Sequence, residues 1–137
     1  MKNIKKIIYD IMTTDTTILG IIWDKEQVYY QNDDAEVNRA EAKFDAEKSI
    51  ITYYRISEKV HDYPKRVAIF QITCWDRDNT NAETLKNAVI STFNRRKNSE
   101  WLSYVSLADV GPEIYDSAFK AWGIPLTFIF IFRDIDY

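Results

Sequence analysis

The sequence predicts an α+β fold, with a four-stranded, mostly antiparallel sheet and helices packed on one of its faces. Two helical patterns open the chain, and the predicted order of elements is α-α-β-β-α-β-β. Strands joined by short connections pair most simply as antiparallel neighbours. The helices must bury their apolar stripes against another layer, so the pattern indicates a sandwich of helices on a sheet.

At 137 residues, the chain is expected to form a single domain, residues 1–137. Hydrophobic residues make up 46% and charged residues 28%, which is typical of a soluble globular protein. Aromatic residues reach 15%, more than a small core needs, and Tyr and Trp are favoured at protein interfaces. The composition therefore hints at assembly.

The charge balance and the cysteine count argue against several classes of protein. A formal net charge of −3 disfavours a dedicated nucleic-acid binder. Cys74 is the only cysteine, which excludes an intrachain disulfide and a thiolate metal cluster and fits folding in a reducing cytoplasm. The first ten residues lack the apolar core of a signal peptide, and the longest apolar run, residues 126–132, is too short for a membrane helix.

Two helices are predicted at the start of the chain. Isoleucines spaced three and four residues apart predict an amphipathic helix over residues 3–12. Asp15 is placed to cap a shorter helix over residues 16–22, although Gly20 weakens it. A short extended piece follows at residues 28–30.

Residues 31–48 are predicted to form a long polar loop or arm. They hold six acidic and three basic residues, and their only large apolar residues are Val37 and Phe44. Long loops in compact domains are more often functional than idle. The candidate assembly-interface residues are Val37, Glu41, Lys43 and Phe44 from this arm, together with Trp122.

Two strands are predicted after the arm, over residues 50–56 and 66–75, because both are rich in β-branched and aromatic residues. One face of the second strand is wholly apolar and is expected to lie under a helix; it is formed by Ala68, Phe70, Ile72 and Cys74. Residues 57–65, which include His61 and Pro64, predict a break between the strands.

A third helix is predicted over residues 81–96. Thr80 is placed to cap it, and Glu83 completes a capping box. Its apolar stripe is Ala82, Leu85, Val89 and Phe93. The basic residues Arg95, Arg96 and Lys97 suit the negative end of the helix dipole, an interpretation preferred to contact with nucleic acid.

The end of the chain predicts two further strands, over residues 101–107 and 125–133. Between them, residues 109–123 are predicted to be irregular or partly helical, with a turn at Gly111-Pro112. Both faces of the last strand are apolar, so it is expected to be central or covered on each side, partly by a neighbouring subunit. Trp122, just before it, fits either the edge of a core or an interface.

Few residues suggest chemistry. Asp76 and Asp78 are candidate ligands for a divalent metal, but aspartates just before a helix more often form turns and stabilise its positive end. Glu41 and Lys43 match the acidic-x-Lys element of a common nuclease core, which also needs an upstream aspartate on a strand. His61 is the only histidine and is expected to be solvated. We therefore predict no catalytic residue, metal or cofactor.

The central region resembles the tail-completion (tail terminator) family of long-tailed bacteriophages. The residues that carry the resemblance are Ile-Thr-Tyr-Tyr-Arg-Ile at 51–56, Tyr63-Pro64, the strand at 67–75 with Phe-Gln-Ile-Thr-Cys-Trp, and the helix with Ala82, Leu85 and Val89. The similarity spans residues 4–132, and its motifs are structural and hydrophobic. Residues 31–48 are longer and more acidic than the family pattern.

The resemblance implies a virion protein that forms a ring, often a hexamer, on the head-proximal end of a phage tail tube. This assembly is expected to take place in the host cytoplasm. Such a ring stops tube growth and offers a surface to the head. Its implied partners are further copies of itself, the major tail tube protein and the head-tail connector protein; DNA passes through the lumen without specific binding, and no membrane is involved. The alternatives are a head-side connector or neck protein and, from another class, a metal-dependent nuclease.

Overall fold

A computed structural model describes residues 4–23, 27–30, 49–62, 65–94, 96, 102–117 and 120–133. Within these residues lie three helices and six strands. They are, in chain order, α1 (Ile4–Thr14), α2 (Thr16–Ile22), β1 (Val28–Tyr30), β2 (Ile50–Asp62), β3 (Lys65–Asp76), α4 (Asn79–Phe93), β4 (Leu102–Val110), β5 (Ile114–Asp116) and β6 (Ala121–Arg133).

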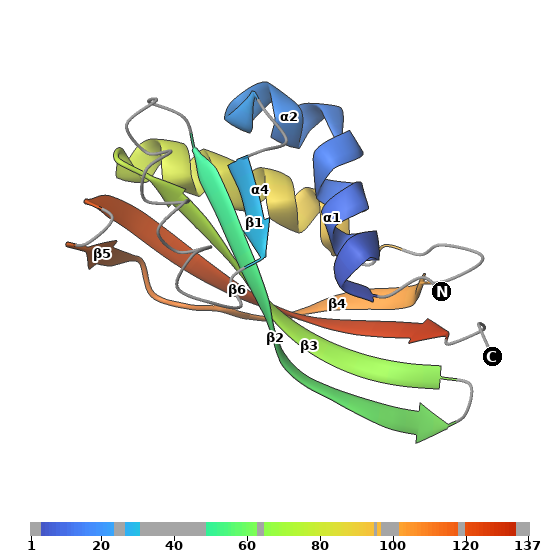
Figure 1. Cartoon of the computed structure of the whole chain (residues 1–137). Coiled ribbons are helices and arrows are strands. Elements are labelled where there is room, and N and C mark those ends of the chain that lie inside the picture. The colour runs from blue at the N-terminus through green and yellow to red at the C-terminus, as the bar shows by residue number, and fades with distance from the viewer. Residues whose placement is uncertain are drawn as a thin grey trace.

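The strands form one sheet in the order β1-β2-β3-β6-β4, with β5 paired to the start of β6 (Figure 1). Only β1 and β2 are parallel; the other pairs are antiparallel. The α+β class and the mostly antiparallel sheet are confirmed. The prediction of four strands was wrong: the extended piece predicted at residues 28–30 is β1 and joins the sheet, and β5 is a three-residue strand too short to show a period in the sequence.

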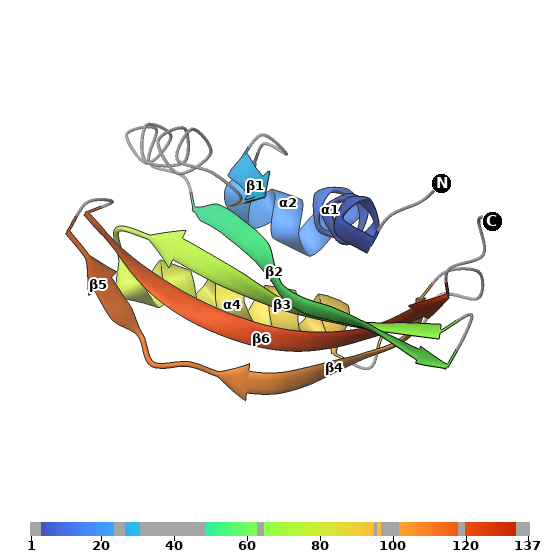
Figure 2. The same ribbon diagram turned by 60° about the horizontal axis from the view of Figure 1, so that its bottom comes forward.

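The three helices lie together on one side of the sheet (Figure 2). The first two agree with the predicted helices, and Asp15 caps α2 by accepting a hydrogen bond from the Ile18 amide at 3.0 Å. The isoleucines of α1 share one buried core with α4 and with the apolar face of β3. Phe70 is fully buried at its centre, where its ring meets that of Phe130 edge to face at 5.7 Å.

The break predicted between the first two long strands is absent, because β2 continues to Asp62 and forms a hairpin with β3. The polar residues of this stretch do not end the strand, since the hairpin extends beyond the helices and needs no apolar face there (Figure 1). Glu58 instead links two strands by accepting from Arg55 at 3.1 Å and from Arg66 at 3.0 Å. His61 therefore belongs to a strand; its side chain lies outside the described part.

The start of α4 also differs from the prediction. Asp78, and not Thr80, caps the helix, by accepting a hydrogen bond from the Thr80 amide at 2.8 Å. The capping box is absent, because Glu83 pairs with Lys86 at 2.7 Å. Aspartate forms this short capping turn readily, so the helix begins at Asn79, two residues earlier than the Thr-x-x-Glu spacing indicated.

The far end of α4 is reached at Phe93, and Asn94 follows as its C-cap. Of the predicted basic cluster, Arg96 donates to the Thr92 carbonyl at 3.4 Å, which agrees with a helix-end role. Arg95 and Lys97 lie outside the described residues.

Residues 109–123 are largely extended, which corrects the irregular or helical prediction. β4 runs to Val110, β5 pairs with the start of β6, and β6 already begins at Ala121. The turn predicted at Gly111-Pro112 was wrong, because β4 and β5 both run antiparallel to β6 along the same edge. The Gly111 amide, between these two strands, donates to the Pro125 carbonyl at 2.8 Å. β6 pairs with β3 on one side and β4 on the other, so its predicted central position is confirmed.

Candidate assembly interface

The face of the sheet opposite the helices carries an apolar strip. Val67 and Ile69 on β3 stand opposite Ile131 and Ile129 on β6, and all four are half-buried. No described helix packs on this face, whereas their neighbours on the helical face, such as Phe70, are fully buried. The strip has uncovered apolar surface, as expected for a strand that is apolar on both faces.

An uncharged polar ladder continues the same face. Tyr54 donates its hydroxyl hydrogen to Gln71 Oε1 at 3.1 Å, and Gln71 Nε2 donates to Thr73 Oγ1 at 3.2 Å. The first bond crosses from β2 to β3 and the second runs along β3, and together they hold these side chains in place on the pleated surface. The apolar strip and the polar ladder together make an uncharged surface that is suited to protein contact rather than to chemistry.

A second, smaller core closes one end of this face. It contains Tyr29, Ile50, Trp75 and Ala121. The indole of Trp75 is anchored by a hydrogen bond from Nε1 to Thr52 Oγ1 at 2.8 Å and lies against Gly123, where a Cβ atom would come within 2.5 Å of the ring. Trp75 is therefore a structural residue.

Trp122, the one predicted interface residue within the described part, lies at the edge of the core. It is half-buried, and its ring meets that of Tyr115 on β5 edge to face at 5.3 Å. This position fits both interpretations made from the sequence, the edge of a core and an interface between proteins. The other predicted interface residues, Val37, Glu41, Lys43 and Phe44, lie outside the described residues and stay predictions.

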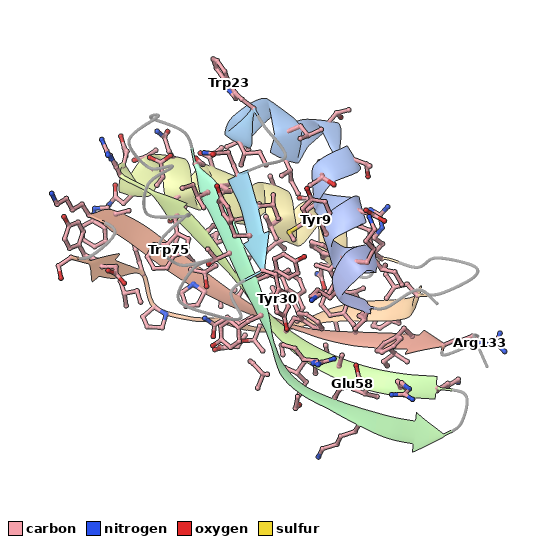
Figure 3. All side chains as sticks on the ribbon, in the orientation of Figure 1. Tyr9, Trp23, Tyr30, Glu58, Trp75 and Arg133 are labelled. Carbon is pink, nitrogen blue, oxygen red and sulfur yellow. The ribbon has the colours of Figure 1, made fainter. Side chains whose placement is uncertain are left out.

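Sequence reasoning missed the segment beside Trp122. Val110, Ile114 and Tyr115 are 45%, 48% and 54% exposed. The Gly111-Pro112 pair, which has apolar residues on both sides in the sequence, could have drawn attention to this segment. Trp23 is the most exposed large hydrophobic residue in the described part at 71%, and it points away from the body at the end of α2 (Figure 3).

The residues with chemical potential have structural partners. Asp76 Oδ2 accepts from Ser49 Oγ at 2.6 Å and its Oδ1 accepts from the Asp78 amide at 2.8 Å, while Asp78 caps α4. No group of three or more His, Cys, Asp or Glu in the described ranges is placed to hold a metal ion. Full burial raises the pKa of the Cys74 thiol, which disfavours a reactive thiolate.

A groove between α2 and α4, about 490 Å³ in volume, is lined by polar residues that include Asp15, Thr92 and Arg96. Thr92 Oγ1 donates to Asp15 Oδ2 at 3.0 Å, so the carboxylate is already bound by the hydroxyl and by the helix amide. This hydrogen bond in the groove therefore links α4 to the start of α2, and it has a structural role. No helix in the described part is long and apolar enough to span a membrane.

No protein-family model and no curated protein matches this sequence. Among solved structures, a chain from the virion of a native gene transfer agent (GTA) particle matches with a TM-score of 0.61 and 13% sequence identity. The two chains share a fold. The match covers 93% of this chain and 92% of the other.

Proposed function

We propose that this chain is a structural protein of a phage-like virion that caps the head-proximal end of a tail tube. In this role it stops tube growth and provides the surface on which the head is joined. The observation that carries the proposal is the fold shared, over 93% of the chain, with a chain of a virion. The resemblance of residues 4–132 to the tail terminators supports the more specific role.

The proposed assembly is a ring of identical copies, a hexamer, held between the major tail tube protein and the head-tail connector protein. An open sheet face with Val67, Ile69, Ile129 and Ile131 half-exposed supports a role in contacts between proteins. A formal net charge of −3 suits a lumen through which DNA passes without sticking, because like charges repel.

The proposal includes no enzymatic activity and no cofactor. A nuclease would need free carboxylates to bind a metal ion. Asp76 instead accepts hydrogen bonds from the Ser49 hydroxyl and the Asp78 amide, and Asp78 accepts one from the Thr80 amide of α4. Metal-dependent cleavage of DNA by the purified chain, lost in Asp76→Ala, would contradict this part of the proposal.

Deletion of the gene for this chain from the phage or phage-like genome that carries it tests the proposed role. Without a cap, tubes continue to polymerise, so electron micrographs should show tails of abnormal and widely scattered length, without heads. Expression of the chain from a plasmid should restore uniform tails. Tails of normal length that fail to join heads would contradict tail termination and would indicate the head-side neck protein instead.

A further inference from the structure

One end of the sheet presents an acidic, partly apolar surface, the acidic corner. We define it by Asp109, Val110, Glu113, Ile114 and Tyr115. Residues 109–116 contain three acidic residues and no basic one. Three of the corner's side chains, Val110, Ile114 and Tyr115, are 45–54% exposed.

The acidic corner is built into the fold. The segment between β4 and β5 is tied to β6 by the hydrogen bond from the Gly111 amide to the Pro125 carbonyl, and β5 pairs with residues 121–123 of β6. The ring of Tyr115 rests on Trp122. These contacts hold the exposed apolar side chains in place, so a partner would meet a surface that is already ordered.

The other end of the sheet presents a basic surface, the basic hairpin. It comprises the β2–β3 hairpin from Arg55 to Arg66, and Arg133 of β6, and it holds five basic and two acidic residues. Arg55 and Arg66 both pair with Glu58. Ile56, at a register shift in β2, is 50% exposed and adds an apolar contact.

Three exposed cations remain on this hairpin: Lys59, Lys65 and Arg133. Lys65 and Arg133 are direct register partners, and like charges placed opposite each other destabilise a sheet. An acidic partner would relieve this repulsion.

The two surfaces cannot meet within one molecule. The pairing of Lys65 with Arg133 marks one end of the β3–β6 ladder, and the pairing of Asp76 with Trp122 marks the other. The strand residues of the acidic corner pair with positions 122–127 of β6, six to eleven residue steps from Arg133, which is roughly 20–36 Å along an extended strand. Figure 1 shows β5 and the β2–β3 hairpin at opposite ends of the sheet. Their attraction is therefore available only to a second molecule.

We propose that the acidic corner of one copy docks on the basic hairpin of the next copy. Both surfaces carry opposite charge and exposed apolar side chains, so their contact would combine electrostatic complementarity with apolar burial. The contact is head-to-tail, and such contacts repeat from copy to copy and close into a ring when the rotation between neighbours permits. This inference deepens the proposed function, on which it rests, by naming the contact that builds the ring.

Charge reversal on each surface tests the contact. The hairpin variant carries Lys59→Glu and Lys65→Glu, and the corner variant carries Asp109→Lys and Glu113→Lys. We expect each to raise the dissociation constant for self-association at least tenfold, roughly, in sedimentation or native mass measurements at low salt. The chain with all four changes should regain association, because the two surfaces are complementary again.

Two controls keep the result specific. Lys6→Glu places one of the same charge changes on α1, on the helical side of the sheet, and should leave association unchanged. Circular dichroism should show that all variants are folded, since every substituted side chain is exposed.

Several outcomes would overturn the inference. A wild-type chain that stays monomeric at high concentration, or reversal variants that assemble like the wild type, would each show that this contact does not join copies. Loss of self-association in both reversal variants, without its recovery in the chain with all four changes, would also reject the inference. That result would point to other protein partners for the two surfaces. The tail-length phenotype of the gene deletion is measured separately, so the proposed function can survive any of these results.

Discussion

Phe70→Ala should lower the free energy of unfolding by about 3–5 kcal/mol, the largest loss we expect from any single substitution in this chain. Phe70 is fully buried, and its ring packs against Phe130 at 5.7 Å and Tyr53 at 6.4 Å. Truncation removes apolar contacts and leaves a cavity between the sheet and the helices. Urea unfolding, followed by circular dichroism, measures the change.

The neighbouring residue gives a matched control. Ile69 follows the same strand but points to the open face, where it is half-buried opposite Ile129. Ile69→Ala should therefore cost only about 1–2 kcal/mol. Equal losses in the two variants would mean that the two faces of β3 are not distinguished by burial, which would contradict the layered fold.

Gly123→Ala should lower the free energy of unfolding by about 1–3 kcal/mol. An added Cβ would lie 2.5 Å from Cζ3 and 2.7 Å from Cε3 of Trp75. The indole cannot shift freely, because it is 6% exposed and hydrogen-bonded to Thr52. At Gly20, in α2, an added Cβ would have no atom within 4 Å. Gly20→Ala should therefore stabilise the chain by about 0.5–1 kcal/mol.

A double-mutant cycle separates the clash from a general loss of strand stability. In a Trp75→Leu background the space above Gly123 is freed, so Gly123→Ala should cost little further. An undiminished cost in that background would show that Trp75 does not restrict this position.

Parts of the fold were predictable where a single periodic pattern determined the structure. The isoleucines of α1, the Asp15 cap of α2 and the alternating face of β3 each carry their own local signal, and all three agree with the structure. The α+β class and the central position of β6 followed from these elements and from the two apolar faces of the last strand.

The errors lie where tertiary context outweighs local pattern. The segment from Ser57 to Asp62, which is mostly polar in sequence, is a strand because β3 pairs with it. Asp78 and Thr80 both suit a helix cap, and only the geometry of the turn selects Asp78. β5 is extended because β6 is beside it, and three residues alone give no period.

The candidate interface was predictable only in part. Trp122 was identified from the sequence, and the structure places it beside the exposed Tyr115. The acidic corner and the basic hairpin were not identified, although each comes mainly from one stretch of the sequence, because the sequence does not show where those stretches lie on the sheet. Their opposite placement depends on the register between β3 and β6, which composition does not encode.

Polymerisation of the major tail tube protein with and without this purified chain tests the central claim most directly. If the chain caps tubes, tubes should become shorter and more numerous as its concentration rises, and electron micrographs should show it at one end only. Tubes of unchanged length with no chain bound at either end would contradict the account.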